Sequence, residues 1–145
     1  MPLNSKFYIP MQSQLRAAIL WFLLVFCYLI HGYYHLAELF FGVDIKVPDA
    51  KGAVPVSAHL FSVFIEILPL ALGLLSLYKT AKWLQWVSFI FAILLGLLNL
   101  VHLGGTIAKE AGEIRQVALL TFILVVNILL IRETNRQRKG IAVAG

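Results

Sequence analysis

Six side chains able to ligate metal ions or carry protons lie within long apolar stretches of this sequence: His31, His35, Glu38, His59, Glu66 and His102. Imidazole nitrogens and carboxylate oxygens are ligands of Cu, Zn and Fe ions. An ionisable group at membrane depth is energetically costly, on the order of 3 kcal/mol for a charged side chain near the centre, and it usually marks a functional site. The residue types therefore indicate metal ligation or proton transfer in apolar surroundings.

The spacing of these residues predicts that they share helix faces. His31, His35 and Glu38 follow one another at intervals of four and three residues, which places them on one face of a helix. His59 and Glu66 are seven residues apart and also share a face. At a rise of about 1.5 Å per residue, all six positions fall in the same half of their apolar stretches. We expect the faces to meet in one cluster.

From this cluster we predict a transition-metal site for Cu, Zn or Fe. His35, His59 and His102 are the expected ligands, and Glu38 completes their shell. The remaining two residues, His31 and Glu66, form a second and deeper position or an outer-shell partner. A saturated site would be structural or a carrier, whereas an open position would allow redox or Lewis-acid catalysis. The metal prediction therefore covers both an enzyme and a metal-handling protein.

Three alternatives use the same residues. In a proton- or ion-coupled transport subunit, His31 and Glu66 would pass protons without a bound ion. In a b-type haem protein for electron transfer, His35 or His59 would pair with His102 as axial ligands. As a third alternative, the polar side chains would simply hydrogen-bond between helices.

Composition identifies the elements that must position these residues. The chain has 145 residues, of which 61% are hydrophobic and 13% charged, and its mean hydropathy is +0.88. These values exclude an ordinary soluble domain. Four apolar stretches, at approximately 17–41, 54–78, 83–103 and 114–131, predict an all-α integral membrane four-helix bundle that forms one domain over 1–145. The single cysteine, Cys27, excludes a disulfide framework.

The distribution of charge predicts the orientation of the bundle. The N-terminal segment, the second loop and a basic tail at 132–145 hold eight cations and one acid, whereas the first and third loops hold four of each. By the positive-inside rule both termini are cytoplasmic. The net charge of +5 then reflects contact with anionic headgroups of the lipid bilayer, and no nucleic acid is required. We expect a multi-pass protein of a prokaryotic inner membrane, as a homo-oligomer or a subunit of a larger membrane complex.

Individual proline, glycine and polar residues predict details of three helices. Pro69 lies in the middle of the second apolar stretch, where its missing N–H should bend the helix. Gly104 and Gly105 are expected to end the third helix. In the fourth helix, Glu113 and Gln116 are the candidates to join the polar cluster, and contacts with neighbouring helices are expected for Thr121 and Asn127.

Overall fold

The computed structural model describes residues 5–46, 50, 52–110 and 112–140, and these residues contain no strand. The helices are, in chain order, α1 (Ser5–Ala37), the 3-10 turn η1 (Glu38–Phe41), α2 (Val56–Ser62), the π-helical turn η2 (Val63–Ile67), α3 (Leu68–Tyr78), α4 (Lys82–Glu110) and α5 (Ile114–Lys139). The prediction of an all-α fold is therefore confirmed.

Within the described residues, four helical segments are long and apolar enough to cross a membrane, by length and composition: Gln12–Phe41, Val56–Tyr78, Lys82–Lys109 and Ile114–Lys139. They correspond to the four stretches expected from the sequence, and most extend further than predicted. A helix of this length satisfies its backbone hydrogen bonds internally, as an apolar environment requires.

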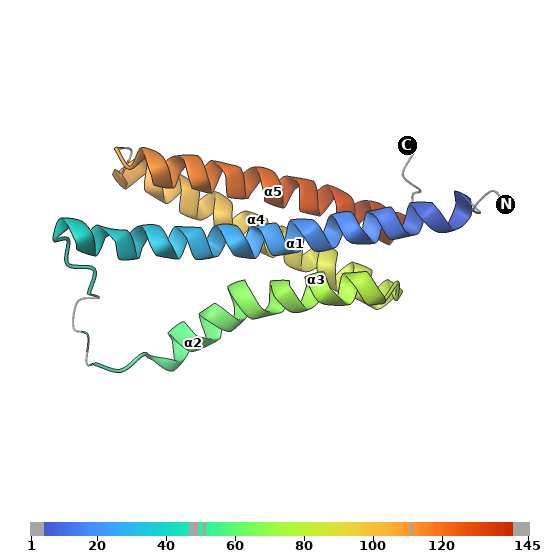
Figure 1. The fold of residues 1–145 in the computed structure, drawn as a ribbon, viewed down its shortest axis with the longest axis horizontal. Helices are drawn as coiled ribbons and strands as arrows, with labels where there is room; N and C mark the ends of the chain where they lie inside the picture. Colours follow the sequence, from blue (N-terminus) through green and yellow to red (C-terminus); the bar gives the residue numbers. More distant parts are fainter. Residues whose placement is uncertain (1–4, 47–49, 51, 111, 141–145) are drawn as a thin grey trace.

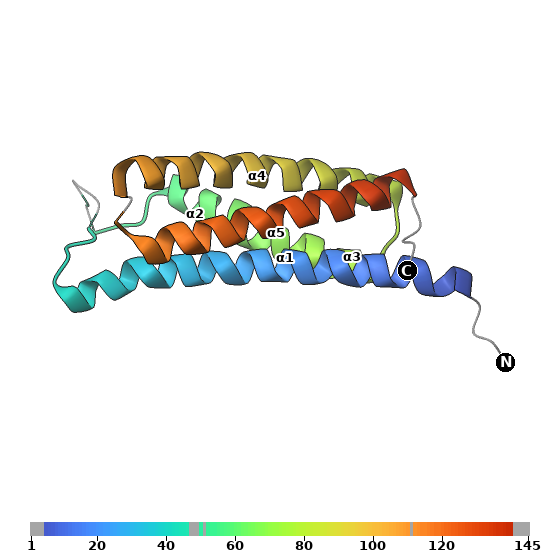
Figure 2. The same cartoon turned by 90° about the horizontal axis from the view of Figure 1, so that it is seen from above.

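The helices pack side by side around a continuous apolar core. α5 packs against both α1 and α4, and α1 also packs against α3 (Figures 1 and 2). Trp21, Leu95 and Ile123 are fully buried where these helices meet. The first turns of α1 and the last turns of α5 lie at the same end of the bundle (Figure 1), which we call the basic end because it holds Arg16 and Arg132. The opposite end is called the histidine end.

The second span is bent, as Pro69 predicted. Directly before this buried proline, the chain forms the π-helical turn η2, in which the backbone N–H of Leu68 donates to the carbonyl oxygen of Val63. A π turn leaves room for the proline ring, which would collide with a carbonyl in a regular helix. α3 buries Leu72 and Gly73 against the bundle, whereas α2 buries no residue and leans away from α1 (Figure 1).

Two helices run further than expected. The prediction that Gly104 and Gly105 end the third helix is wrong, because α4 continues to Glu110. Leu103 and Thr106 are buried on either side of the glycine pair, so helix packing continues across it. Residues 132–139, predicted as a tail, form the last turns of α5, where Thr134 is fully buried. Residues 141–145 of that tail lie outside the described residues.

Candidate functional site

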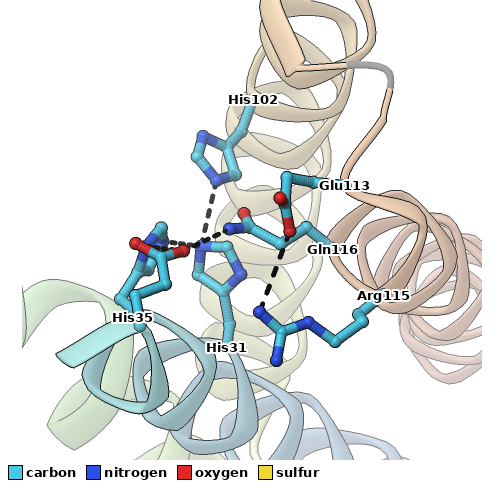
Figure 3. A network of polar contacts seen from close by, with 7 residues as sticks. His31, His35, His102, Glu113, Arg115 and Gln116 are labelled. Atoms are coloured by element: carbon cyan, nitrogen blue, oxygen red, sulfur yellow. Dashed lines mark hydrogen bonds and ion pairs between the residues drawn. The ribbon is translucent and has the colours of Figure 1, made fainter. Parts of the chain in front are cut away.

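Three imidazoles from two helices meet at the histidine end. The last turns of α1 carry His31 and His35, and α4 carries His102. The Nε2 atom of His31 lies 3.2 Å from Nε2 of His35 and 3.1 Å from Nε2 of His102 (Figure 3). Both neighbouring rings stand edge-on to the His31 ring, at interplanar angles of 85° and 88°. The three residues are called the histidine cluster below.

Nε2 of His31 has more nitrogen neighbours than it can hydrogen-bond to. A neutral imidazole nitrogen carries either one proton or one lone pair. Nε2 of His31 can therefore form one linear hydrogen bond, although two nitrogen atoms lie within hydrogen-bond distance of it. Its Nδ1 atom is buried and has no hydrogen-bond partner among the described residues. Hydrogen bonds among the three imidazoles therefore leave one of the two close nitrogen–nitrogen contacts at His31 without a linear hydrogen bond.

A carboxylate and an amide extend the cluster to a third helix. Glu38 in η1 places Oε1 3.7 Å from Nδ1 of His35. The same oxygen accepts a hydrogen bond of 3.3 Å from Nε2 of Gln116, which is buried at the start of α5. Gln116 thus joins the cluster as expected, and Figure 3 shows its amide beside the imidazoles. The other candidate, Glu113, pairs with Arg115 instead. Because Glu38 touches both groups, it links the end of α1 to α5.

Charge at the rim of the site is balanced locally. Nη2 of Arg115 lies 3.8 Å from Oε2 of Glu113 (Figure 3), and the Arg115 guanidinium lies 5.3 Å from the centre of the Tyr34 ring. Both charged side chains are nearly half exposed. An exposed pair of this kind contributes little to stability, about 0–1 kcal/mol.

The structure does not bring His59 and Glu66 into the cluster. His59 is exposed on α2, which leans away from the other helices, and Glu66 lies in the π-helical turn. Neither side chain forms a hydrogen bond or ion pair with the rest of the described chain. Of the six residues predicted to form the site, His31, His35, Glu38 and His102 are therefore brought together.

A second polar network lies one helical turn deeper and was missed in part. The amide of Asn99 donates to the hydroxyl of Tyr28 at 2.8 Å and also donates to Oδ1 of Asn127. Nδ2 of Asn127 donates to the carbonyl oxygen of Ala92 at 2.9 Å. The expected contact of Asn127 with a neighbouring helix is confirmed. The same expectation for Thr121 is wrong, because its exposed hydroxyl donates to the carbonyl oxygen of Val117 in its own helix. Tyr28 was not predicted, although its position three residues before His31 was a signal for it.

The Nε2–Nε2 separations in the histidine cluster match the spacing of nitrogen ligands around one metal ion. With metal–nitrogen bonds of about 2.0–2.1 Å, two neighbouring ligand nitrogens lie about 2.9–3.4 Å apart. The two Nε2 separations at His31, 3.1 and 3.2 Å, fall in this interval. In the described part of the chain, however, no three His, Cys, Asp or Glu side chains are already arranged around one position for an ion. For all three imidazoles to bind one ion, the rings of His35 and His102 would therefore have to rotate.

Comparison with protein-family models, with curated proteins and with solved structures finds no match to this chain. The described part of the chain is a helical bundle with four helices long and apolar enough to span a membrane, and an imidazole cluster lies between two of them.

Proposed function

We propose that the protein is a multi-pass membrane protein with both termini in the cytoplasm and its histidine end toward the opposite side. Three features support this topology. In the part of the chain that the structure describes, four segments have the length and hydropathy of membrane spans. The start of α1 and the end of α5 share one end of the bundle (Figure 2), as an even number of spans requires. That end also holds most of the unbalanced cations.

We further propose that the histidine cluster binds a transition-metal ion through His31, His35 and His102. The observation that carries this proposal is the approach of two Nε2 atoms to a single Nε2 atom, at 3.1 and 3.2 Å. An ion would accept all three lone pairs at once, whereas a proton satisfies one contact at His31. His102 is exposed and the His35 side chain is 46% exposed, so both rings have room to rotate toward one ion.

The donor set selects the kind of metal. Neutral imidazoles suit Cu, Zn and Fe, whereas Mg²⁺ and Ca²⁺ prefer oxygen ligands. Glu38, held by Gln116, supplies a carboxylate next to His35. A bound ion would provide Lewis-acid or redox chemistry if one coordination position stays open, and metal handling if none does.

The test is a metal titration of the full-length protein purified without a histidine tag. Cu²⁺ and Zn²⁺ binding to the chelator-treated protein is measured by calorimetry, and elemental analysis gives the stoichiometry. We expect one ion per chain for the wild type and more than about 100-fold weaker binding for His31→Ala, because a lost ligand should cost more than the 10–100-fold of a lost outer-shell partner.

The matched control is His59→Ala, which removes the same side chain from the splayed helix α2. We expect this variant to bind metal as the wild type does. Equal losses in His59→Ala and His31→Ala, or no loss in either, would refute the assignment. Circular dichroism of each variant checks that the helices are retained.

A second candidate function, proton transfer, is favoured by the continuity of the polar contacts. Glu38, His35, His31 and His102 follow one another at separations of 3.7, 3.2 and 3.1 Å. Neighbouring imidazoles at such distances can exchange a proton after small ring rotations. This function predicts a protein that binds no stoichiometric metal and whose transport activity depends on pH in the histidine range. Histidine NMR titration with and without Zn²⁺ distinguishes it from metal binding.

The haem alternative receives less support. Two axial ligands lie on opposite faces of the porphyrin ring, with the iron between them. His31 lies between His35 and His102, so a haem ligated by these two residues would have to displace the His31 ring. A bound haem would show its strong Soret absorption band in the purified protein.

A further inference from the structure

A cavity of about 340 Å³ lies between α1 and α5 at the basic end, far from the histidine cluster. Its polar lining includes Arg16 of α1 and Arg132, Glu133 and Arg136 of α5. Arg132 and Arg136 are four residues apart and therefore project from the same face of α5. Three guanidinium groups thus border one cavity that opens on the surface of the bundle.

The charge of this cavity is not balanced by its own acid. Within the described part of the chain, none of the three guanidinium groups forms an ion pair with a carboxylate. The single lining acid, Glu133, is buried and accepts a hydrogen bond from the hydroxyl of Ser13. The nearby Arg138 differs, because its guanidinium covers the Trp86 ring at 4.3 Å.

The cavity also has an apolar wall. Ile19 on α1 and Leu129 on α5 line it and are 53% and 45% exposed. Each lies one turn from an arginine on the same helix, toward the middle of the span: Ile19 follows Arg16 by three residues, and Leu129 precedes Arg132 by three. A ligand that fits both surfaces carries an anionic group at one end and hydrocarbon at the other.

We propose that this cavity binds the phosphate group of an anionic phospholipid, with the acyl chains lying along Ile19 and Leu129. The proposal rests on the membrane insertion proposed above. Arginine is suited to phosphate because its planar fork donates two parallel hydrogen bonds. Basic pockets between helices on the cytoplasmic side are characteristic sites for such headgroups. A free phosphate would share the chemistry of the headgroup but gain nothing from the apolar wall.

The experiment measures lipid binding to the full-length protein by native mass spectrometry, with phosphatidylglycerol and phosphatidylcholine of equal chain length. The test variant combines Arg16→Gln, Arg132→Gln and Arg136→Gln. The control combines Lys79→Gln, Lys82→Gln and Lys139→Gln, which removes the same charge near the same end but outside the cavity. We expect at least roughly 100-fold weaker phosphatidylglycerol binding for the triple variant, because each cavity arginine loses a charge-assisted hydrogen bond to the phosphate. The control should change little, because its exposed lysines lie outside the cavity and their attraction to the lipid is screened.

Equal losses in the two triple variants would overturn the proposal, because binding would then follow overall charge. Equal binding of the two lipids by the wild type would also overturn it. Competition by millimolar glycerol phosphate as effective as by the lipid would assign the cavity to a soluble phosphate instead. Should the triple variant misfold, Arg132→Gln alone replaces it, with circular dichroism as the check. Flotation of wild-type proteoliposomes tests membrane insertion separately, so its failure is distinguishable from loss of lipid selectivity.

Discussion

Replacing Asn127 by alanine tests whether the buried amide network holds α4 and α5 together. Asn127 is fully buried on α5 and forms two interhelical hydrogen bonds, one from its Nδ2 to the carbonyl oxygen of Ala92 and one from Asn99 to its Oδ1. Interhelical hydrogen bonds in membrane proteins contribute about 0.6 kcal/mol each on average. The lost volume adds to this, at about 24 cal/mol per Å³ of residual cavity. We expect Asn127→Ala to lower the free energy of unfolding by about 2 kcal/mol.

The assay is reversible unfolding in mixed micelles with increasing sodium dodecyl sulfate, followed by circular dichroism. A double-mutant cycle with Asn99→Ala isolates the one bond that the two amides share. We expect a coupling energy of about 0.6 kcal/mol, below the maximum of about 1.7 kcal/mol for such bonds.

The control for this cycle is Thr121→Ala, also on α5. Thr121 is exposed, and its hydroxyl donates to the carbonyl oxygen of Val117 in its own helix. Its replacement should change the free energy of unfolding by less than about 0.5 kcal/mol. If Asn127→Ala is as mild as the control, or if the coupling energy with Asn99→Ala is zero, the network does not stabilise the bundle and the reasoning fails.

Two further pairs of substitutions test the packing of α1. A Cβ atom at Gly73 would lie 3.0 Å from Cβ of the buried Trp21, so Gly73→Ala should lower the free energy of unfolding by about 1–3 kcal/mol, measured in thermal or micelle unfolding. The control is Gly32→Ala, because a Cβ atom there meets nothing within 4 Å. This change should leave the free energy of unfolding the same or raise it. Ser13→Ala removes the hydroxyl that donates to the buried Glu133 and should lower the free energy of unfolding by about 1–3 kcal/mol. Adding Glu133→Leu should restore much of this loss, because no buried carboxylate is then left without its donor. If the second change does not restore stability, Glu133 has another role.

Helical periodicity made part of the site predictable. His31, His35 and Glu38 share a face in any regular helix, whatever packs against it. The depth of His102 followed from its distance along an apolar stretch of the length of a span. These two regularities are local, and they were sufficient to predict that imidazoles from the first and third spans lie at one end of the bundle.

The fate of His59 was not predictable because it depends on the π-helical turn. One extra residue in a turn rotates everything before it by about 100° relative to everything after it. The face that holds His59 therefore no longer continues the face on which Leu72 and Ser76 are buried. Pro69 indicated a bend, but its direction is set by the local backbone that accommodates the ring.

The glycine pair in α4 illustrates the same limit. Gly104 and Gly105 have low helix propensity, and sequence rules place helix ends at such residues. Burial of Leu103 and Thr106 outweighs this preference, and the hydroxyl of Thr106 donates to the carbonyl oxygen of His102 within the helix. Tertiary packing, which a single sequence does not display, decided where the helix ends.

The second span consists of a part that packs on α1 and a part that does not, and this division has a consequence if the helices cross a membrane as proposed. α3 packs against α1, whereas α2 makes few contacts outside its own span. When the hydrocarbon thickness changes, a span adjusts by tilting or bending. In a bilayer, α2 would be free to change its tilt about the turn while α1, α3, α4 and α5 keep their contacts. Thickness mismatch would then be absorbed by α2, without disturbing the imidazoles between α1 and α4.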